Sequence, residues 1–89
     1  TDLCHLVTPA TLAADVPVPG KIFLTSNRLV FAGGRVQAWP WHRLRGVTRL
    51  GRDVVAILGG DDGVRLQCNS YGDAMVARHV ARRLAKHVK

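Results

Sequence analysis

Basic and aromatic residues gather in one stretch near the middle of the chain. The sequence Trp39-Pro40-Trp41 is followed closely by four arginines, Arg43, Arg45, Arg49 and Arg52. A guanidinium group pairs with carboxylates or phosphates through parallel hydrogen bonds and stacks on aromatic rings. We therefore predict a surface that contacts acidic groups, with Trp41 as its anchor and Trp39 in the core. The other interpretation is that one tryptophan lies in the core and the other covers an edge of the fold.

A second basic surface is predicted near the C-terminus. Its bases recur at helical spacing, namely Arg78, Arg82, Lys86 and Lys89. Such a face can lie on an acidic membrane or bind a partner, and the plainer interpretation is a solvated helix face. Lys21 is a further candidate, because binding of anionic lipid requires it to cluster with the arginines between residues 43 and 52.

No residues are spaced as a catalytic or metal site. The chain has two serines, Ser26 and Ser70, both in turn or cap contexts, and it lacks hydrolase, zinc-protease and P-loop sequences. The glycine-rich segment 59–63 lacks the Gly-Lys-Ser/Thr ending of a P-loop, so a hairpin turn is the preferred interpretation. No histidine or cysteine has a neighbour at zinc-ligand spacing. We expect no enzyme activity, no cofactor and no metal.

Composition bounds the class of protein and its partners. The chain has 89 residues, 47% of them hydrophobic, which suits one globular domain spanning residues 1–89. Its net charge of +7 favours anionic surfaces, meaning lipid headgroups, nucleic acid or acidic protein. Nucleic acid is the weakest of these, because neither an aromatic platform for single strands nor a groove-reading helix is apparent.

The cysteines and the N-terminal sequence indicate a compartment. Two cysteines, Cys4 and Cys68, are too few for a disulfide-stapled secreted domain of this size. The first residues lack the pattern of a signal peptide, and no apolar run is long enough to span a membrane. We expect a cytoplasmic piece of a longer protein, able to act at membrane surfaces.

The first two thirds of the chain read as short strands. The β-prone segments are residues 4–7, 21–25, 29–32, 35–39, 44–50, 54–58 and 64–68, separated by turn residues such as Gly33-Gly34. The proline-containing stretch 15–20 is not expected in a central strand, and Pro40 is expected to end a strand or to mark an edge.

After Cys68 the period changes to that of a helix. Ser70 and Asp73 have the spacing of a capping box. The residues Val76, Val80, Leu84 and Val88 recur every four positions, with alanines beside them, and predict an amphipathic helix from about Tyr71 to Val88. Predicted core residues are Ile22, Leu24, Phe31, Ile57, Leu66, Val76, Val80 and Leu84.

Several motifs resemble those of PH-like domains of the GRAM and BEACH-associated kind. Residues 4–9 look like the opening of the PH-like domain that precedes BEACH domains. Residues 20–25 and 28–31 are similar to a hairpin shared with GRAM domains, and Trp39-Pro40, Leu44 and Val47 match a later stretch of the family. The resemblance implies a mostly β fold, a bent antiparallel seven-stranded barrel capped by one C-terminal α-helix.

The resemblance also implies a binding module rather than an enzyme. Phosphoinositide-binding PH domains carry a basic cluster around the first hairpin loop, whereas residues 14–20 here contain Asp15 and no base. We therefore expect a docking module in a larger trafficking or scaffold protein. Its partner would be a neighbouring domain such as BEACH or another subunit. The contact surface would include exposed Trp41 and Met75. Weak electrostatic binding of anionic lipid or phosphoinositide membranes is the alternative.

Overall fold

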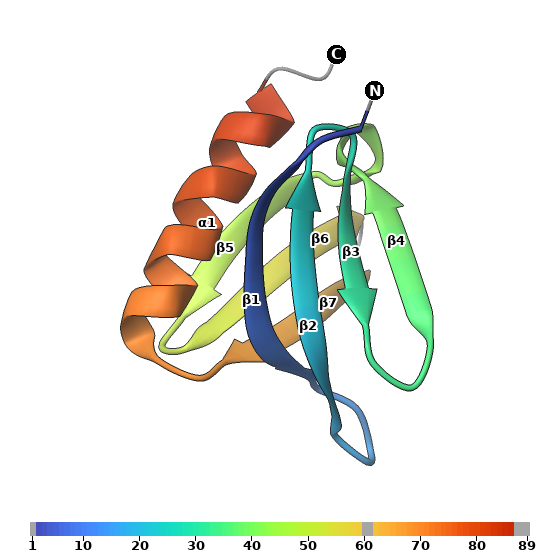
Figure 1. The fold of residues 1–89 in the computed structure, drawn as a ribbon, viewed down its shortest axis with the longest axis vertical. Helices are drawn as coiled ribbons and strands as arrows, with labels where there is room; N and C mark the ends of the chain where they lie inside the picture. Colours follow the sequence, from blue (N-terminus) through green and yellow to red (C-terminus); the bar gives the residue numbers. More distant parts are fainter. Residues whose placement is uncertain (1, 60–61, 87–89) are drawn as a thin grey trace.

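A computed structural model describes residues 2–59 and 62–86. It contains seven β-strands followed by one α-helix (Figure 1). The strands are β1 (Cys4–Leu12), β2 (Val18–Thr25), β3 (Arg28–Ala32), β4 (Val36–Pro40), β5 (Gly46–Leu50), β6 (Asp53–Gly59) and β7 (Asp62–Cys68). A short 3-10 helix, η1 (Trp41–Arg43), connects β4 to β5, and helix α1 runs from Tyr71 to Lys86. The predicted strands and the C-terminal helix are confirmed.

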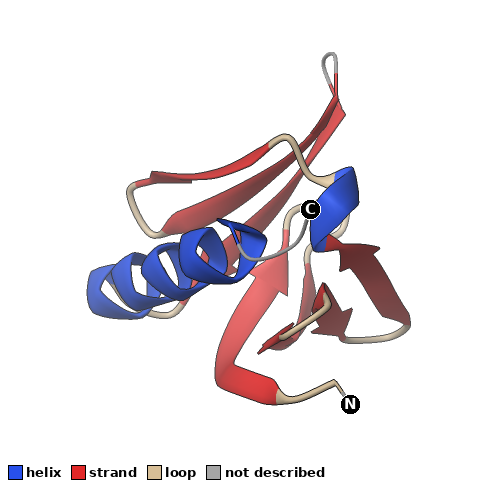
Figure 2. Cartoon of the chain, turned by 90° about the horizontal axis from the view of Figure 1, so that it is seen from above, coloured by secondary structure: helices blue, strands red, loops and turns tan. Residues whose placement is uncertain are grey.

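All the strands belong to one antiparallel sheet in the order β4-β3-β2-β1-β7-β6-β5. The long strand β1 joins two groups, because it pairs with β2 along its length and with β7 at Ala10–Leu12. Strands β1 to β4 lie in front of β5 to β7 in Figure 1, and α1 runs along one side of both groups (Figure 2). Strands β4 and β5 are the two edges of the sheet.

The proline-containing segments are more strand-like than the sequence suggested. Strand β1 continues through Pro9, and β2 already begins at Val18 and includes Pro19. Both prolines are tolerated because each has a strand on one side only. Pro9 lies just outside the β1–β7 pairing, and Pro19 lies outside the β2–β3 pairing. Pro40 ends the edge strand β4, as predicted.

The core lies between the two groups of strands and the helix. Predicted core residues Ile22, Leu24, Phe31 and Leu66 are buried. Ile57 was predicted to be buried but is partly exposed, because Val54 and Ala56 are the residues of β6 that point inward. Side chains alternate along a strand, so an error of one residue in phase exchanges the two faces.

Helix α1 presents a different face to the sheet from the one predicted. Ala74, Ala77 and Ala81 are buried, whereas Val76 is 50% exposed. Val80 and Leu84 lie at one border of the buried stripe, partly buried against the core. Alanine side chains let the helix lie close to the sheet, so the small residues face inward. One of the two bonds of the predicted capping box is confirmed: the Asp73 N–H donates to the Ser70 hydroxyl over 3.1 Å.

Candidate functional site

Trp41 is not the exposed anchor that the sequence predicted. Its side chain is 1% exposed, and its indole N–H donates to the Thr25 carbonyl over 2.8 Å. After Pro40 the chain turns inward through η1, and the Trp41 backbone N–H donates to the Asn27 carbonyl over 3.1 Å. Trp39 is only partly buried against the core. The role predicted for Trp41 is therefore wrong, whereas Trp39 does pack against the core, as predicted, although it is not fully buried.

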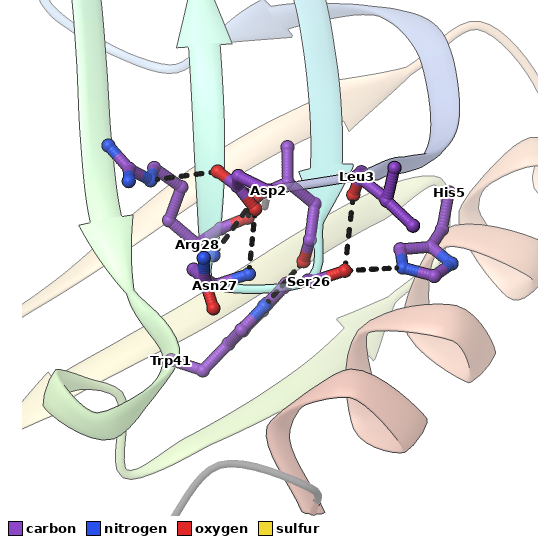
Figure 3. A network of polar contacts seen from close by, with 8 residues as sticks. Asp2, Leu3, His5, Ser26, Asn27, Arg28 and Trp41 are labelled. Atoms are coloured by element: carbon purple, nitrogen blue, oxygen red, sulfur yellow. Dashed lines mark hydrogen bonds and ion pairs between the residues drawn. The ribbon is translucent and has the colours of Figure 1, made fainter.

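The surroundings of Trp41 are fastened by the N-terminal segment (Figure 3). The Asp2 carboxylate pairs with the Arg28 guanidinium over 3.2 Å and accepts hydrogen bonds from the Asn27 N–H and the Thr25 hydroxyl. The His5 Nε2 atom and the Ser26 hydroxyl share a hydrogen bond of 2.8 Å. These polar groups satisfy one another and hold the start of the chain on the β2–β3 turn, so their evident role is structural.

The four arginines predicted to form one surface lie at two ends of β5. Arg43 and Arg45 precede the strand and are exposed, whereas Arg49 and Arg52 lie at its far end, next to the turn into β6. Because a strand rises roughly 3.4 Å per residue, Arg45 and Arg49 are about 14 Å apart along it. Lys21 lies on β2, which three strands separate from β5 in the sheet order.

The basic face of the helix is also placed differently from the expectation. Arg78 is partly buried, and the Arg82 Nε donates to the Val47 carbonyl over 3.2 Å, so Arg82 turns towards β5. They are not simply a solvated face. The side chain of Lys86 and all of Lys89 lie outside the described residues. Met75 is 49% exposed, as its predicted role in a surface patch requires, but it has no exposed Trp41 beside it.

The strongest candidate site is the cleft between β5 and α1, which we call the β5–α1 groove. Helix α1 makes its most extensive contacts with β5 (Figure 1). At one end of the groove the Arg49 guanidinium lies 4.4 Å from the centre of the Tyr71 ring. At the other end a cavity of about 380 Å³ is lined by Gly46, Val47, Arg82 and Ala85. Arg78 lies between the two ends, because Tyr71, Arg78 and Arg82 share one face of the helix.

Two guanidinium atoms in this groove are buried without a partner. The Nε atoms of Arg49 and Arg78 have no hydrogen-bond acceptor among the described residues. A buried donor left unsatisfied costs about 1–3 kcal/mol, so each such group calls for an explanation. One explanation is that a bound ligand supplies the acceptor, and this would also account for the position of both arginines beside the groove.

The positive charge of the groove is not compensated from within the described chain. Among the described residues the ion pairs are Arg28–Asp2 and Arg65–Asp53, and neither of them involves Arg49, Arg78 or Arg82. Three arginines along one groove repel one another and attract an anionic partner. The geometry therefore suits binding of carboxylates or phosphates.

Two other hollows are weaker candidates. One of about 400 Å³ lies between the start of β1 and the last turns of α1, and its polar lining is His5, His79 and Arg83. The other, of about 330 Å³, lies at the opposite end of the sheet beside Phe31 and contains one base, Arg35. Neither combines a strand edge with unpartnered buried donors.

Sequence reasoning singled out all three arginines of the groove but did not predict the groove. Arg49 was assigned to one predicted surface, and Arg78 and Arg82 to another. The residues that it missed are Tyr71 and Val47. A signal was present: Tyr71 stands on the helical face of Arg78 and Arg82, and Val47 alternates with Arg49 along the strand. What the sequence did not reveal is that this helix face lies against β5.

Comparisons with known proteins support the fold. No protein-family model matches this chain, and no curated protein matches it by sequence. A structure of the N-terminally truncated linker-DH/PH domains of p115-RhoGEF is similar with a TM-score of 0.82 at 10% identity; the match covers 100% of this chain and 30% of that one. The C-terminal domain of an unknown protein from Leishmania infantum gives a TM-score of 0.75 at 10% identity, covering 85% and 80% of the two chains.

These likenesses establish the expected PH-like fold, an open sheet of seven antiparallel strands with one C-terminal helix. They do not reach the GRAM or BEACH-associated subtype. Within residues 2–59 and 62–86, no helix combines the length and the apolar character needed to cross a membrane.

Proposed function

We propose that this chain is a non-catalytic docking module that binds a protein partner in the β5–α1 groove. The observation that carries the proposal is the set of three arginines beside a free sheet edge, two of them with buried Nε atoms that lack an acceptor. A partner that enters the groove would provide those acceptors. Arginine and tyrosine are also enriched among the residues that dominate binding energy at protein interfaces.

The GRAM or BEACH-associated subtype is part of the same proposal, as is a cytoplasmic role in a larger trafficking or scaffold protein. The residues that support it are Trp39-Pro40, Leu44 and Val47, together with the hairpin sequence of β2 and β3. The partner would then be a neighbouring BEACH domain or another subunit. A gene that encodes a BEACH domain directly after residue 89 would agree with this assignment.

Anionic lipid is less well supported as the ligand. The loop between β1 and β2, residues 13–17, contains no base, and the arginines 43, 45, 49 and 52 do not form one patch with Lys21. A flat membrane surface also does not fit a narrow groove between a strand edge and a helix, whereas a peptide segment does. Protein is therefore the preferred partner.

The experiment is a selection of binding peptides from a displayed random library on the immobilised domain. We expect enriched peptides to lose binding to the double variant Arg49→Met/Arg78→Met, which keeps the apolar stems but removes the guanidinium groups. The control Arg43→Ala/Arg45→Ala removes the same charge outside the groove and should bind normally.

Two results would count against the proposal. In one, the selection enriches no peptide. In the other, the enriched peptides bind equally well to the Arg49→Met/Arg78→Met variant. Circular dichroism of both variants checks that they remain folded.

A further inference from the structure

We infer that the occupant of the β5–α1 groove is an extended acidic segment that pairs with β5 as an additional strand. The inference rests on the proposed docking function and specifies the chemistry of the partner. Three features carry it: the backbone groups that β5 leaves free, the spacing of the arginines, and the absence of acidic partners for them among the described residues.

The pairing pattern shows which backbone groups of β5 are free. Strand β5 pairs only with β6, and the two-residue turn Gly51-Arg52 closes this hairpin at the pair Leu50 and Asp53. That closing pair is hydrogen-bonded, and the direction of the backbone groups alternates along an antiparallel strand. Gly46, Thr48 and Leu50 therefore bond to β6, whereas Val47 and Arg49 direct their N–H and C=O groups away from the sheet.

One contact in the structure confirms that direction. The Arg82 Nε reaches the outward-facing carbonyl of Val47 over 3.2 Å. Among the described residues, the Val47 N–H and both backbone groups of Arg49 have no partner. A peptide laid along β5 would bond to these groups, as strands added to a free sheet edge do. Arg82 is exposed, so its guanidinium can move from the carbonyl to an incoming carboxylate.

The spacing of the arginines suits a strand with acids at alternate positions. Arg78 and Arg82 are one helical turn apart, which is about 6 Å along α1. Side chains on one face of an added strand recur every two residues, which is about 6.8 Å. Successive acidic side chains on that face would therefore meet successive arginines. The side chains of the other face would point away from the helix and can be of any polar type.

Charge selects the class of segment. Arg49, Arg78 and Arg82 have no carboxylate partner among the described side chains, and the whole chain has a net charge of +7. An arginine–carboxylate pair is a charge-assisted hydrogen bond, which is stronger than a bond to a neutral acceptor. A segment with glutamate or aspartate at every second position would pair with the guanidinium groups and with the backbone edge together.

The test uses a synthetic eight-residue peptide that alternates glutamate with threonine, titrated into the isotope-labelled protein and followed by NMR. We expect the largest shifts at the Val47 and Arg49 amides, and slower hydrogen exchange there by about tenfold or more. Affinity should fall as salt is added. It should also fall at least about tenfold in Arg49→Met/Arg78→Met and remain unchanged in Arg43→Ala/Arg45→Ala.

Two control peptides separate the parts of the inference. Replacement of every glutamate by lysine should abolish binding, and equal binding of that peptide would overturn the acidic specificity. Methylation of the backbone nitrogens that face β5 should also abolish binding. If it does not, or if the β5 amides do not shift, the added strand is wrong.

The inference and the proposed docking function fail in different ways. If the display selection yields groove-dependent peptides that are neutral, and the glutamate peptide does not bind, the docking function stands and the acidic strand is refuted. If neither the selection nor the glutamate peptide gives groove-dependent binding, both are refuted.

Discussion

Trp41 shows how one residue can link three segments of the chain. Its ring is enclosed in the core, its indole N–H binds the end of β2, and its backbone N–H binds the β2–β3 turn. The Asp2 carboxylate also binds this turn, through the Asn27 N–H and the Arg28 guanidinium. Loss of this ring would therefore affect the β2–β3 turn and the N-terminal segment as well as the core.

We predict that Trp41→Ala destabilises the protein by about 3–5 kcal/mol, as loss of a fully buried aromatic ring does. For a small domain this is a large share of the free energy of unfolding. Trp39→Ala, which removes a ring that is only partly buried, should cost less. Urea melts of the two variants make the comparison. An equal loss in both would contradict the assignment of Trp41 as the central tryptophan.

The buried cysteine, Cys68, should titrate differently in the folded and the unfolded protein. Burial, assisted by the negative charges of Asp73 and Asp53, raises the pKa of the Cys68 thiol. The folded state therefore favours the protonated thiol. The resulting stabilisation is fully present below the ordinary thiol pKa and is lost as the pH rises through the raised value.

We therefore expect the wild-type protein to lose more stability than Cys68→Ala as the pH rises above the ordinary thiol pKa. Urea melts of both proteins under reducing conditions, between neutral and alkaline pH, measure the difference. Other groups titrate equally in the two proteins and cancel. Parallel stability curves would show that the Cys68 thiol does not contribute.

At the scale of elements, β2 and the β3–β4 turn touch at Gly20. A Cβ atom at this position would overlap the carbonyl oxygen of Ala32 and lie 2.8 Å from the Gly33 Cα. We predict that Gly20→Ala destabilises the protein by roughly 1–3 kcal/mol, because backbone atoms must shift. Gly34→Ala is the matched control, since no atom lies within 4 Å of its added Cβ. Thermal melts should show a loss for the first variant only.

The helix offers a second comparison between neighbouring positions. Ala77 is buried against the sheet and Val76 is exposed. Ala77→Leu should cost about 1–3 kcal/mol through overpacking, whereas Val76→Ala should change stability by less than about 0.5 kcal/mol. Thermal melts of the two variants are sufficient. A larger loss at residue 76 would mean that the valine stripe faces the sheet after all.

The sequence predicted which elements form better than it predicted which way they face. Turn residues and the change of period after Cys68 located the strands and the helix, because these signals are local. The errors at Ile57, Val76 and Trp41 share a different cause. Each concerns the direction of a side chain. For Ile57 that direction depends on the phase of the strand, and for Val76 and Trp41 it depends on how the neighbouring elements pack. The small alanines of α1 face inward because the helix lies close to β5, and no local pattern contains that distance.

For the whole molecule, the dispersion of the arginines has a measurable consequence. Only Arg49, Arg78 and Arg82 share a groove, so any binding to anionic membranes should be weak. We predict that sedimentation with phosphatidylserine vesicles occurs at low salt and largely disappears at physiological ionic strength, where charges are screened over about 8 Å. Salt-resistant binding to one phosphoinositide would contradict this and favour a stereospecific lipid site.

The candidate site was predictable in composition but not in position. The sequence contains the arginines, and the chemistry they favour follows from their side chains. Their assembly requires that α1 lie against the edge strand β5, which is a non-local fact. Arg49 and Arg78 belong to elements that are far apart in the sequence, and they were therefore assigned to separate surfaces.

The start of β1 and the last turns of α1 are neighbours, since His5 and Leu84 line the same hollow. The start of β1 can consequently be joined to the end of α1, and the chain can be opened at another loop. A circular permutant that joins residues 2 and 86 with a short flexible linker, and opens the chain in the loop 13–17, should keep every strand pairing and fold to the same structure. The groove would be retained, because β5 and α1 remain in one unbroken segment of the permuted chain. In evolutionary terms, such a domain can be inserted into a loop of another protein without separating the two halves of its host.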